Sequence, residues 1–430
     1  MAFSQSFFAR GSEIADFKEV GHYDTFSVVV NNLPKKIDTS FGLSRICINA
    51  VHKRVSDLKI QLLSPDGNSI WLTNRNGADS GRDLQGTCFR SNGFNGYIHQ
   101  ANAPFEGEFI PDGRMEFINN GQNPNGKWSL LVQDLKAEVT GKLYDFSLEF
   151  SSQPMPGLVS GPCSFENPGP CICTSTDSIL QPDLAIIPVF TDQQIKEYEW
   201  NDPNYPGQLR FAATIGNLGE GPFEIEGDGK WHCGGELVSD GKTKCPDGSY
   251  PRQNLIQKLY RKSVNTLVPT ERVAGTNYFD TKPGHEHYHV DDWVEFILLD
   301  FKKSISYSIK KRREVARSRK VSYCLFDSGI CSNRDSICLM NGIVMGEKNL
   351  TNYGLGNYAS CKEKNQGISV GGYDTYGMMY EGQFIQLPKR LKTGYYLLLI
   401  QIDPQNKYVD INRSNNLYIK KIFLSKQNKS

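Results

Sequence analysis

"DLKIQLLSPDGNSIWLTN", residues 57–74, shows the pattern that decides the fold of the first third of the chain. Two runs in which apolar and polar residues alternate flank the segment "SPDGNS" at residues 64–69. Alternation with a period of two places one face of a strand against a core and the other in water. Pro, Asp, Gly, Asn and Ser favour tight turns. The stretch therefore predicts two short strands joined by a turn.

The same pattern continues on both sides of this stretch. Further short runs with strand character lie at residues 25–30, 46–52, 128–134 and 144–150. Evenly spaced short strands without a helical stretch favour an antiparallel β sandwich or jelly roll. Cys47 and Cys88 are candidates for a disulfide within it. We predict that residues 1–150 form this first domain.

A change of composition marks the end of that domain. Residues 151–179 are rich in Pro, Gly and Ser and predict a linker. Residues 180–425 return to strand-like runs separated by Gly-rich loops, and the basic run "KKRREVARSR" at 310–319 is a candidate short helix. We expect an all-β protein with a second, loop-rich, disulfide-linked domain at 180–425, followed by a tail at 426–430.

Composition and charge exclude several classes of protein. The 430 residues suit two domains, and a net charge of +1 gives no overall attraction to nucleic acid or acidic lipid. The longest apolar run lies around "YYLLLI" at 395–400. It is far short of the roughly 18 residues that span a bilayer. We therefore expect no nucleic-acid partner and no transmembrane segment.

The 11 cysteines predict a disulfide framework, because most are close in sequence and none forms the double CxxC pattern of a zinc site. The alternative is a reduced chain with scattered thiols. Disulfides indicate an extracellular protein, yet residues 1–17 lack the features of a signal peptide. Either the leader is missing from this sequence or the route of export is unusual. The expected pairs are Cys163 with Cys171 or Cys173, Cys233 with Cys245, Cys324 with Cys331, and Cys338 with Cys361.

The segment "TKPGHEHYHVDDW", residues 281–293, holds three of the chain's seven histidines, His285, His287 and His289. On a regular strand these side chains share one face but spread over about 13 Å. They reach a single metal ion only if the backbone bends, and "KPG" before His285 can supply the bend. Neutral imidazole suits copper or zinc, and copper binds more tightly. The alternative is a polar strand edge with solvated histidines.

Four stretches in order resemble the lysyl oxidase catalytic domain, and the resemblance covers about residues 180–425. "GHEHYH" followed by "FILLD" resembles the copper-binding segment of that family. "RKVSYCLFDSGIC" resembles the segment that carries the cofactor lysine, and "GGYDTYG" the segment that carries the cofactor tyrosine. The last of the four, which resembles the family's C-terminal strands, is "GYYLLLIQIDPQNKYVDINRSNNLYIKKI" at residues 394–422.

The resemblance implies specific residue roles. His285, His287 and His289 match the copper ligands, while Lys320 and Tyr376 match the residues that form lysine tyrosylquinone. A surface role for Lys320 is the alternative, and Tyr373 is the competing tyrosine. Gly284 and Gly372 stand where animal members of the family often have cysteine, so the disulfide pattern must differ.

The implied activity is that of a copper-dependent amine oxidase. It would convert peptidyl-lysine, or a related primary amine, to an aldehyde with O₂, and release ammonia and hydrogen peroxide. The reaction needs a general base, and Asp291, Asp292 and Asp374 all stay open for that role. Two other classes stay open as well. One is a zinc hydrolase that uses the same histidines, and the other is a non-catalytic extracellular binding protein.

The first domain resembles a different family. "DLKIQLLSPDGNSIWLTNRNGAD" and "NGKWSLLVQDLKAEVTGKLYDFSLEF" are similar to the P domain, or homo B domain, of subtilisin-like proprotein convertases. That domain is a β jelly roll without catalytic residues. We expect no peptidase activity, because no Ser-His-Asp triad can be assembled from motifs in the chain. Substrate docking, stability or calcium binding by the loop "NRNGADSGRD" at 74–83 are its candidate roles, and a plain polar turn is the alternative for that loop.

Overall fold

The computed structural model describes residues 4–38, 40–77, 81–152, 154, 163–174, 178–301, 312–318, 321–362, 365–425 and 427. They form two compact units. One consists of Met1–Val159 with Thr281–Glu286, and the other of Ser160–Asp280 with His287–Ser430. Within the described ranges, no helix is long and apolar enough to cross a membrane.

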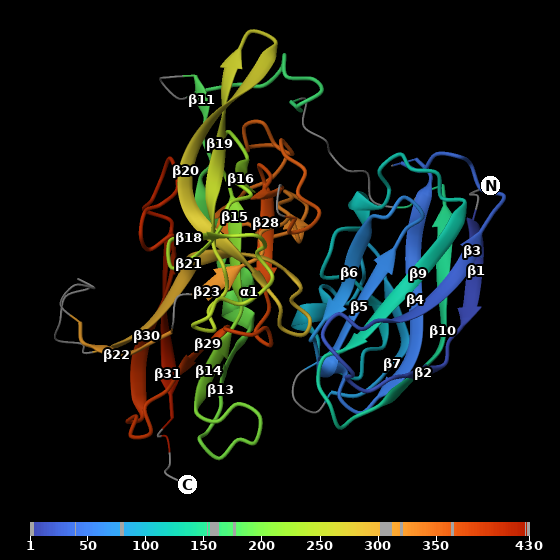
Figure 1. The fold of residues 1–430 in the computed structure, drawn as a ribbon, viewed down its shortest axis with the longest axis horizontal. Coiled ribbons are helices and arrows are strands. Elements are labelled where there is room, and N and C mark those ends of the chain that lie inside the picture. The colour runs from blue at the N-terminus through green and yellow to red at the C-terminus, as the bar shows by residue number, and fades with distance from the viewer. Residues whose placement is uncertain are drawn as a thin grey trace. The chain divides into compact units, whose positions relative to one another are not determined.

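Strands dominate both units, which confirms the expected mostly β fold (Figure 1). One α-helix, α1 (Pro188–Gln193), is found in the described part of the chain. Short 3-10 helices occupy Val55–Asp57, Ile98–Gln100 and Met115–Phe117. The expected domain boundaries near residues 150 and 180 stay a prediction.

The first unit is a β sandwich of two sheets. One sheet runs in the order β1 (Ser4–Arg10), β10 (Gly141–Ser151), β4 (Gly42–His52), β7 (Leu84–Phe89) and β8 (Gly107–Phe109), with β2 (Glu13–Ile14) also paired to β10. The other runs in the order β3 (Asp24–Val30), β9 (Gly126–Asp134), β5 (Leu58–Leu63) and β6 (Ser69–Asn74). The turn predicted at residues 64–69 thus joins β5 and β6 in an antiparallel pair.

Alternation along the strands builds the core of this sandwich. On β10, Phe146, Leu148 and Phe150 are buried, and residues between them face outward. Trp128 on β9 packs edge-to-face on Phe150 with ring centroids 5.5 Å apart. Cys47 on β4 lies directly opposite Cys88 on β7, and the two form the expected disulfide.

The second unit is organised around one large sheet. Its main path is β27 (Gln366–Ile368), β16 (Phe223–Gly227), β19 (Gln253–Ser263), β20 (Thr266–Asp280), β21 (His287–Asp300), β30 (Gly394–Ile402) and β31 (Leu417–Leu424). Three more strands pair at its sides, β11 (Ile179–Leu180) with β19, and β22 (Glu314–Arg317) and β23 (Val321–Tyr323) with β21.

Smaller sheets complete the second unit. One runs β12 (Leu184–Ile186), β15 (Ala213–Asn217), β28 (Gly372–Tyr376) and β24 (Gly329–Ile330). A second runs β13 (Ile195–Glu197), β14 (Gln208–Phe211) and β29 (Phe384–Gln386). Two hairpins pair β17 (Trp231–Cys233) with β18 (Glu236–Val238), and β25 (Leu339–Met340) with β26 (Ile343–Val344).

One core holds the strands that matter for the site. Trp293 and Phe296 of β21 and Tyr376 of β28 belong to the same buried cluster, and Phe211 of β14 packs edge-to-face on Phe296 at 4.7 Å. The strand that carries His287 and His289 and the strand that carries Tyr376 are therefore fixed by shared apolar packing.

The expected short helix at residues 310–319 is wrong where the structure describes it. Glu314–Arg317 is strand β22, which pairs with β21 so that Arg317 lies opposite Ile297. Arg317 also forms an ion pair with Glu295 of β21 at 2.6 Å. Pairing with an existing strand satisfies the backbone of this short segment, and it overrides the weak helix preference of the basic run.

Five disulfides use ten of the 11 cysteines, and the expected pairing is partly wrong. Cys163–Cys171 and Cys233–Cys245 are as expected. However, Cys331 pairs with Cys338 across a turn at residues 332–335, and Cys324 pairs with Cys361. The turn brings Cys338 back to Cys331, which leaves Cys324 and Cys361 to each other. The eleventh cysteine, Cys173, donates from its Sγ to Glu220 Oε2 at 3.8 Å.

The loop considered for calcium, residues 74–83, is only partly described, because residues 78–80 lie outside the described ranges. Asn76 donates to Asp112 at 2.7 Å, and Asp83 accepts the backbone N–H of His52 at 3.1 Å. The carboxylate oxygens of Asp112 and Asp83 thus accept hydrogen bonds from residues of the same unit. Calcium binding therefore stays a prediction.

Candidate metal centre

The backbone bends at the start of the histidine segment, as the convergence of three imidazoles requires. Gly284 has φ +77° and Glu286 has φ +42°, both in the left-handed region. His285 donates its backbone N–H to Lys282 O at 3.0 Å, which closes a turn. Regular strand begins only at His287. His287 and His289 then share a face of β21, and the turn carries His285 back toward them.

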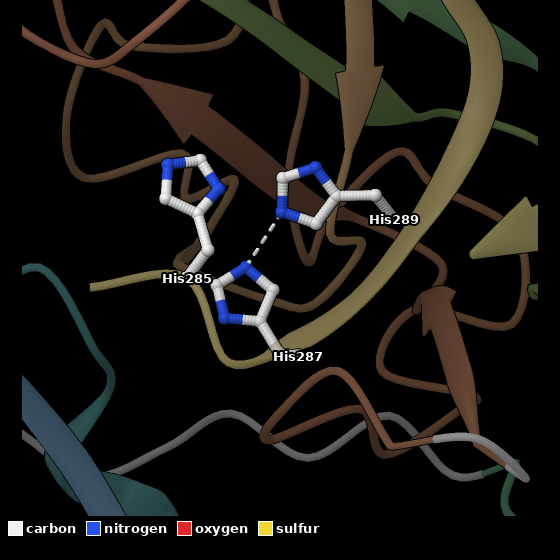
Figure 2. A group of neighbouring side chains, drawn as sticks. All are labelled: His285, His287 and His289. Carbon is white, nitrogen blue, oxygen red and sulfur yellow. Dashed lines mark hydrogen bonds between the residues drawn. The ribbon is translucent and has the colours of Figure 1, made fainter. Parts of the chain in front are cut away.

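The three imidazoles converge on a common space (Figure 2). One ring nitrogen from each of His285, His287 and His289 lies within 4.8 Å of the other two. The Nε2 atoms of His287 and His289 are 2.9 Å apart, at hydrogen-bond distance. His289 is only 3% exposed, whereas the other two histidines are half-buried. The alternative considered for this segment, a polar strand edge with solvated histidines, does not match the burial of His289 and the convergence of the three rings.

The donor set fits a copper or zinc ion. Ligand nitrogens that bind one ion at roughly 2.0–2.1 Å lie about 2.9 Å apart at a right angle and about 3.3 Å apart at a tetrahedral angle. The Nε2 atoms of His287 and His289 are 2.9 Å apart, so either geometry needs only a small ring movement. Three neutral imidazoles also leave coordination positions open for other ligands.

Aromatic and charged side chains support His289 from the neighbouring strands. Tyr278 lies opposite His289 in the β20–β21 ladder, with ring centroids 5.6 Å apart. Tyr250 stacks on Tyr278 at 5.0 Å and donates its hydroxyl to Asp280 at 3.0 Å. The guanidinium group of Arg252 also lies over the Tyr278 ring, 4.9 Å from its centroid. Such contacts restrict the rotation of a ligand side chain.

Tyr376 lies in a tightly constrained position at the end of β28. Its hydroxyl accepts the backbone N–H of Cys324 at 2.6 Å and donates to Cys324 O at 3.2 Å. Its ring stacks on Tyr323 with centroids 3.7 Å apart and planes inclined by 5°. The side chain is 8% exposed, and burial raises the pKa of its phenol well above the ordinary value of 10.0.

The Cys324–Cys361 disulfide connects Tyr376 to the histidines. The two sulfur atoms and a ring nitrogen of His287 all lie within 4.8 Å of one another. Cys324 is the residue whose backbone holds the Tyr376 hydroxyl. Cys324 thus contacts Tyr376 through its backbone and lies beside His287 through its sulfur, although His287 and Tyr376 are 89 residues apart in sequence.

Tyr373, the competing tyrosine, has a different environment. It is fully buried, and its ring approaches Phe190 of α1 at 6.2 Å. A Cβ added at Gly329 would lie 2.2 Å from Tyr373 Cζ, so the ring fills the space above that glycine. This contact pattern is that of a core side chain. Lys320 lies outside the described residues, and the next residue, Val321, begins β23.

The three candidate bases differ in their partners. Asp291 binds Arg252 Nε at 3.1 Å and accepts from Thr276 Oγ1 at 2.9 Å. Asp292 forms an ion pair with Lys407 at 3.3 Å. Asp374 is fully buried, its oxygens have no side-chain partner in the described structure, and the backbone N–H of Thr375 is the nearby donor that lowers its pKa. Burial, and then the negative charge of Asp327, raise the pKa of Asp374 well above 3.8.

Neither the stacking of Tyr323 nor the Cys324–Cys361 pair was predicted from the sequence. An aromatic residue followed by cysteine in "KVSYC" was the available signal, but it does not reveal that Tyr323 stacks on Tyr376. It also does not reveal that the cystine lies beside His287. Both contacts join segments that are distant in sequence.

Known protein families match both parts of the chain. Residues 45–150 match the proprotein convertase P-domain, and residues 271–429 match the lysyl oxidase family. Over 134 residues, or 31% of this chain and 25% of theirs, the sequence is 28% identical to protein-lysine 6-oxidase of Homo sapiens and of Gallus gallus. It is equally similar to lysyl oxidase homolog 1 of Homo sapiens, of which it covers 18%. The chain thus spans a quarter or less of the length of these relatives.

A solved structure with partial similarity is the serine protease of Aeromonas sobria. It covers 35% of this chain and 27% of its own, at 19% identity and a TM-score of 0.21. A similarity of this size supports no inference about function.

The fold and site together define a mostly β, disulfide-linked protein with a candidate three-histidine metal centre. Within that class, the chain carries a P-domain at residues 45–150 and a lysyl oxidase domain at residues 271–429. The match to the lysyl oxidase family begins at residue 271, later than the start near residue 180 that the sequence resemblance predicts.

Proposed function

We propose that this protein is a copper-dependent amine oxidase that converts peptidyl-lysine, or a related primary amine, to an aldehyde. The observation that carries the proposal is the convergence of three imidazoles beside the Cys324–Cys361 cystine, with the Tyr376 hydroxyl bonded to the backbone of Cys324. His285, His287 and His289 would hold copper. A lysine tyrosylquinone formed from Lys320 and Tyr376 would supply an electrophilic carbonyl that accepts electrons from the amine.

The surroundings of Tyr376 suit a residue whose ring must be held for modification. Both hydrogen bonds of its hydroxyl go to the backbone of Cys324, so the ring is held in place at its hydroxyl end. Tyr323 covers one ring face at 3.7 Å. Tyr380 also packs against the ring, with centroids 5.4 Å apart and planes inclined by 69°. An amine, from Lys320 or from a substrate, would approach at the ring positions that these two tyrosines leave open.

Asp374 is the carboxylate that best suits the role of proton acceptor. Alternation along β28 puts Asp374 and Tyr376 on the same face of the strand. Asp291 and Asp292 are each held by a basic side chain, whereas Asp374 has no basic partner among the described residues and only the backbone N–H of Thr375 lowers its pKa. Burial raises the carboxyl pKa of both Asp374 and Asp291 toward the range in which a general base is effective, so the missing basic partner is what distinguishes Asp374. In its ionised form, which the folded protein reaches only above the raised pKa of this carboxyl, Asp374 would take the α-proton of the bound amine.

The five disulfides support an extracellular location for this activity, since such bonds persist in oxidising compartments. The P-domain would then serve to dock a protein substrate or to stabilise the chain. Molecular oxygen is the second substrate, and hydrogen peroxide and ammonia are the further products.

The test is a spectrum of the purified, copper-loaded protein before and after phenylhydrazine. We expect a new visible band in the wild type, with the adduct mapped to a cross-linked peptide containing Lys320 and Tyr376. Lys320→Arg and Tyr376→Phe should lose the band and keep copper, and Tyr373→Phe serves as the matched control that keeps both. Copper at one per chain with no adduct would overturn the proposal.

Metal content and peroxide release separate the other classes. A zinc hydrolase would retain zinc, show no adduct and be indifferent to O₂. A non-catalytic binding protein would release no hydrogen peroxide with any primary amine. Replacement of His289 by Ala should remove bound copper, whereas His232→Ala, which changes a half-buried histidine outside the cluster, should not.

A further inference from the structure

A second set of metal-ligand atoms shares His287 with the three-histidine cluster. Besides His285 and His289, the ring of His287 lies within 4.8 Å of the sulfur atoms of Cys324 and Cys361. These sulfur atoms are joined as a disulfide. Among the described residues, none of the other four disulfides belongs to such a group. Among the five disulfides of the described residues, Cys324–Cys361 therefore differs from the others in having a histidine ring beside its sulfur atoms.

We propose that reduction of Cys324–Cys361 creates a second metal site, formed by the two thiolates and His287, that binds a thiophilic cation such as cuprous copper. Thiolates prefer copper(I) and zinc, whereas imidazole alone is the better ligand set for copper(II). Because His287 belongs to both sets, a cation bound by the sulfurs would draw that imidazole away from His285 and His289. The redox state of one cystine therefore selects between two ligand sets.

The backbone geometry permits this site. The Cα atoms of Cys324 and Cys361 are 5.4 Å apart. Two sulfurs that bind one ion at roughly 2.3 Å lie about 3.8 Å apart at a tetrahedral angle, so the sulfurs only need to separate by side-chain rotation. The backbone N–H and C=O of Cys324 are both bonded to Tyr376, so this cysteine keeps its place after the disulfide opens.

The opening step uses a dithiol reductant. A thiolate of the reductant forms a disulfide bond with one cystine sulfur, and the Cys324–Cys361 bond breaks. Cys361 is 9% exposed and Cys324 is fully buried, so the attack falls on Cys361 and Cys324 leaves as the thiolate. The second thiol of the reductant then displaces Cys361. The reductant ends as a cyclic disulfide, and its two electrons and two protons end on the two cysteines.

The first test is cobalt binding after mild reduction and removal of the dithiol under anaerobic conditions. We expect a near-ultraviolet thiolate-to-cobalt band that saturates at one cobalt per chain and is abolished by added cuprous ion. The band should be missing in C324S/C361S and retained in C331S/C338S, which removes a disulfide of the same domain that has no histidine beside it. A band of equal size in C324S/C361S would overturn the proposal, as would its absence from reduced wild type.

A second measurement uses only the wild type, in case the variants do not fold. Reduced protein is alkylated with and without cobalt, and each cysteine is mapped by mass spectrometry. With cobalt at about 100 times its dissociation constant, Cys324 and Cys361 should react about 100-fold more slowly, since only the unbound thiols react. Cys331 and Cys338 should react at unchanged rates. Equal protection at all four cysteines would contradict the assignment.

The tests of this site do not depend on amine oxidation, although the two ligand sets share His287. Neither experiment uses an amine, O₂ or the phenylhydrazine adduct. Loss of the adduct with an intact cobalt band would overturn the proposed oxidase function alone. An intact adduct without thiolate binding of cobalt would overturn the second metal site alone.

Discussion

Asp374 and Asp327 are two buried carboxylates close enough to affect one another, and they should respond in opposite ways to the same substitution. Both are fully buried. Asp327 accepts Ser369 N–H at 2.9 Å and the Ser369 hydroxyl at 2.5 Å. Asp374 has no hydroxyl partner in the described part of the chain, and burial together with the charge of Asp327 outweighs the Thr375 backbone N–H and raises its pKa well above 3.8. We expect Asp374→Asn to stabilise the protein near neutral pH and Asp327→Asn to destabilise it.

The magnitude follows from proton linkage. Above pH 3.8 the folded state holds the Asp374 proton while the unfolded state releases it, so the free energy of unfolding falls as pH rises. The decline is about 1.4 kcal/mol per pH unit and ends at the pKa of the folded state. Asp374→Asn has no carboxyl to titrate at this position and so lacks this pH dependence. The free energy of unfolding of the variant should therefore exceed that of wild type by an amount that grows with pH, by up to about 1.4 kcal/mol per pH unit. Asp327→Asn should cost about 1–3 kcal/mol, because buried donors lose their acceptor.

Denaturant unfolding of the full chain, measured from about pH 5 to pH 8, tests this pair. Two results would refute the reasoning. One is that Asp374→Asn unfolds more easily than wild type at the upper end of the pH range. The other is that the free energies of unfolding of Asp374→Asn and wild type change in parallel with pH. Stabilisation should come with a slower turnover of amine, because the substituted residue would be the proposed proton acceptor. If Asp374→Asn is both more stable and fully active, the effect of the raised pKa on stability is confirmed, and Asp374 is not the proton acceptor.

Two further predictions concern the first unit and the disulfides. His52→Ala should cost about 3–5 kcal/mol, since it leaves Asp134 buried without the imidazole that lies 3.2 Å away. Burial lowers the pKa of His52, but the hydrogen bond and charge of Asp134 outweigh it and raise the net value above 6.5. The stabilising effect of protonated His52 is therefore full below pH 6.5 and is lost as pH rises through the folded-state pKa, which thermal unfolding against pH would detect. Removal of Cys47–Cys88, with a sequence separation of 41, should cost about 4 kcal/mol, against about 2 kcal/mol for Cys331–Cys338, with a separation of seven. Equal losses in midpoint denaturant concentration would contradict the loop-length argument.

Local patterns predicted much of the fold. The alternating runs at residues 58–63 and 69–73 became β5 and β6, and the apolar run after residue 394 became β30. The β19–β20 hairpin was not predicted, although it is among the longest features of the second unit. Pro269 lies inside β20, where proline normally argues against a strand. It is tolerated because β20 pairs with β21 only at residues 277–280, so near Pro269 only the β19 side is paired.

Disulfide pairing shows where proximity in sequence misleads. Cys324 and Cys331 are close along the chain, but β24 begins between them and pairs with β28, which carries Cys331 away from Cys324. Cys361 then returns to Cys324 over a separation of 37 residues. Sequence spacing measures only the length of the intervening loop, whereas strand pairing decides which ends meet.

The sequence by itself determined the candidate ligands and their chemistry, because three imidazoles at alternate positions and the ordered motifs around Lys320 and Tyr376 are local features. Only the tertiary structure decided that the imidazoles converge, through the left-handed residues Gly284 and Glu286. It alone placed Tyr376 against Cys324, and Cys324 beside His287. Those contacts join strands from distant parts of the chain, and shared burial in one core, which no local pattern specifies, holds them together.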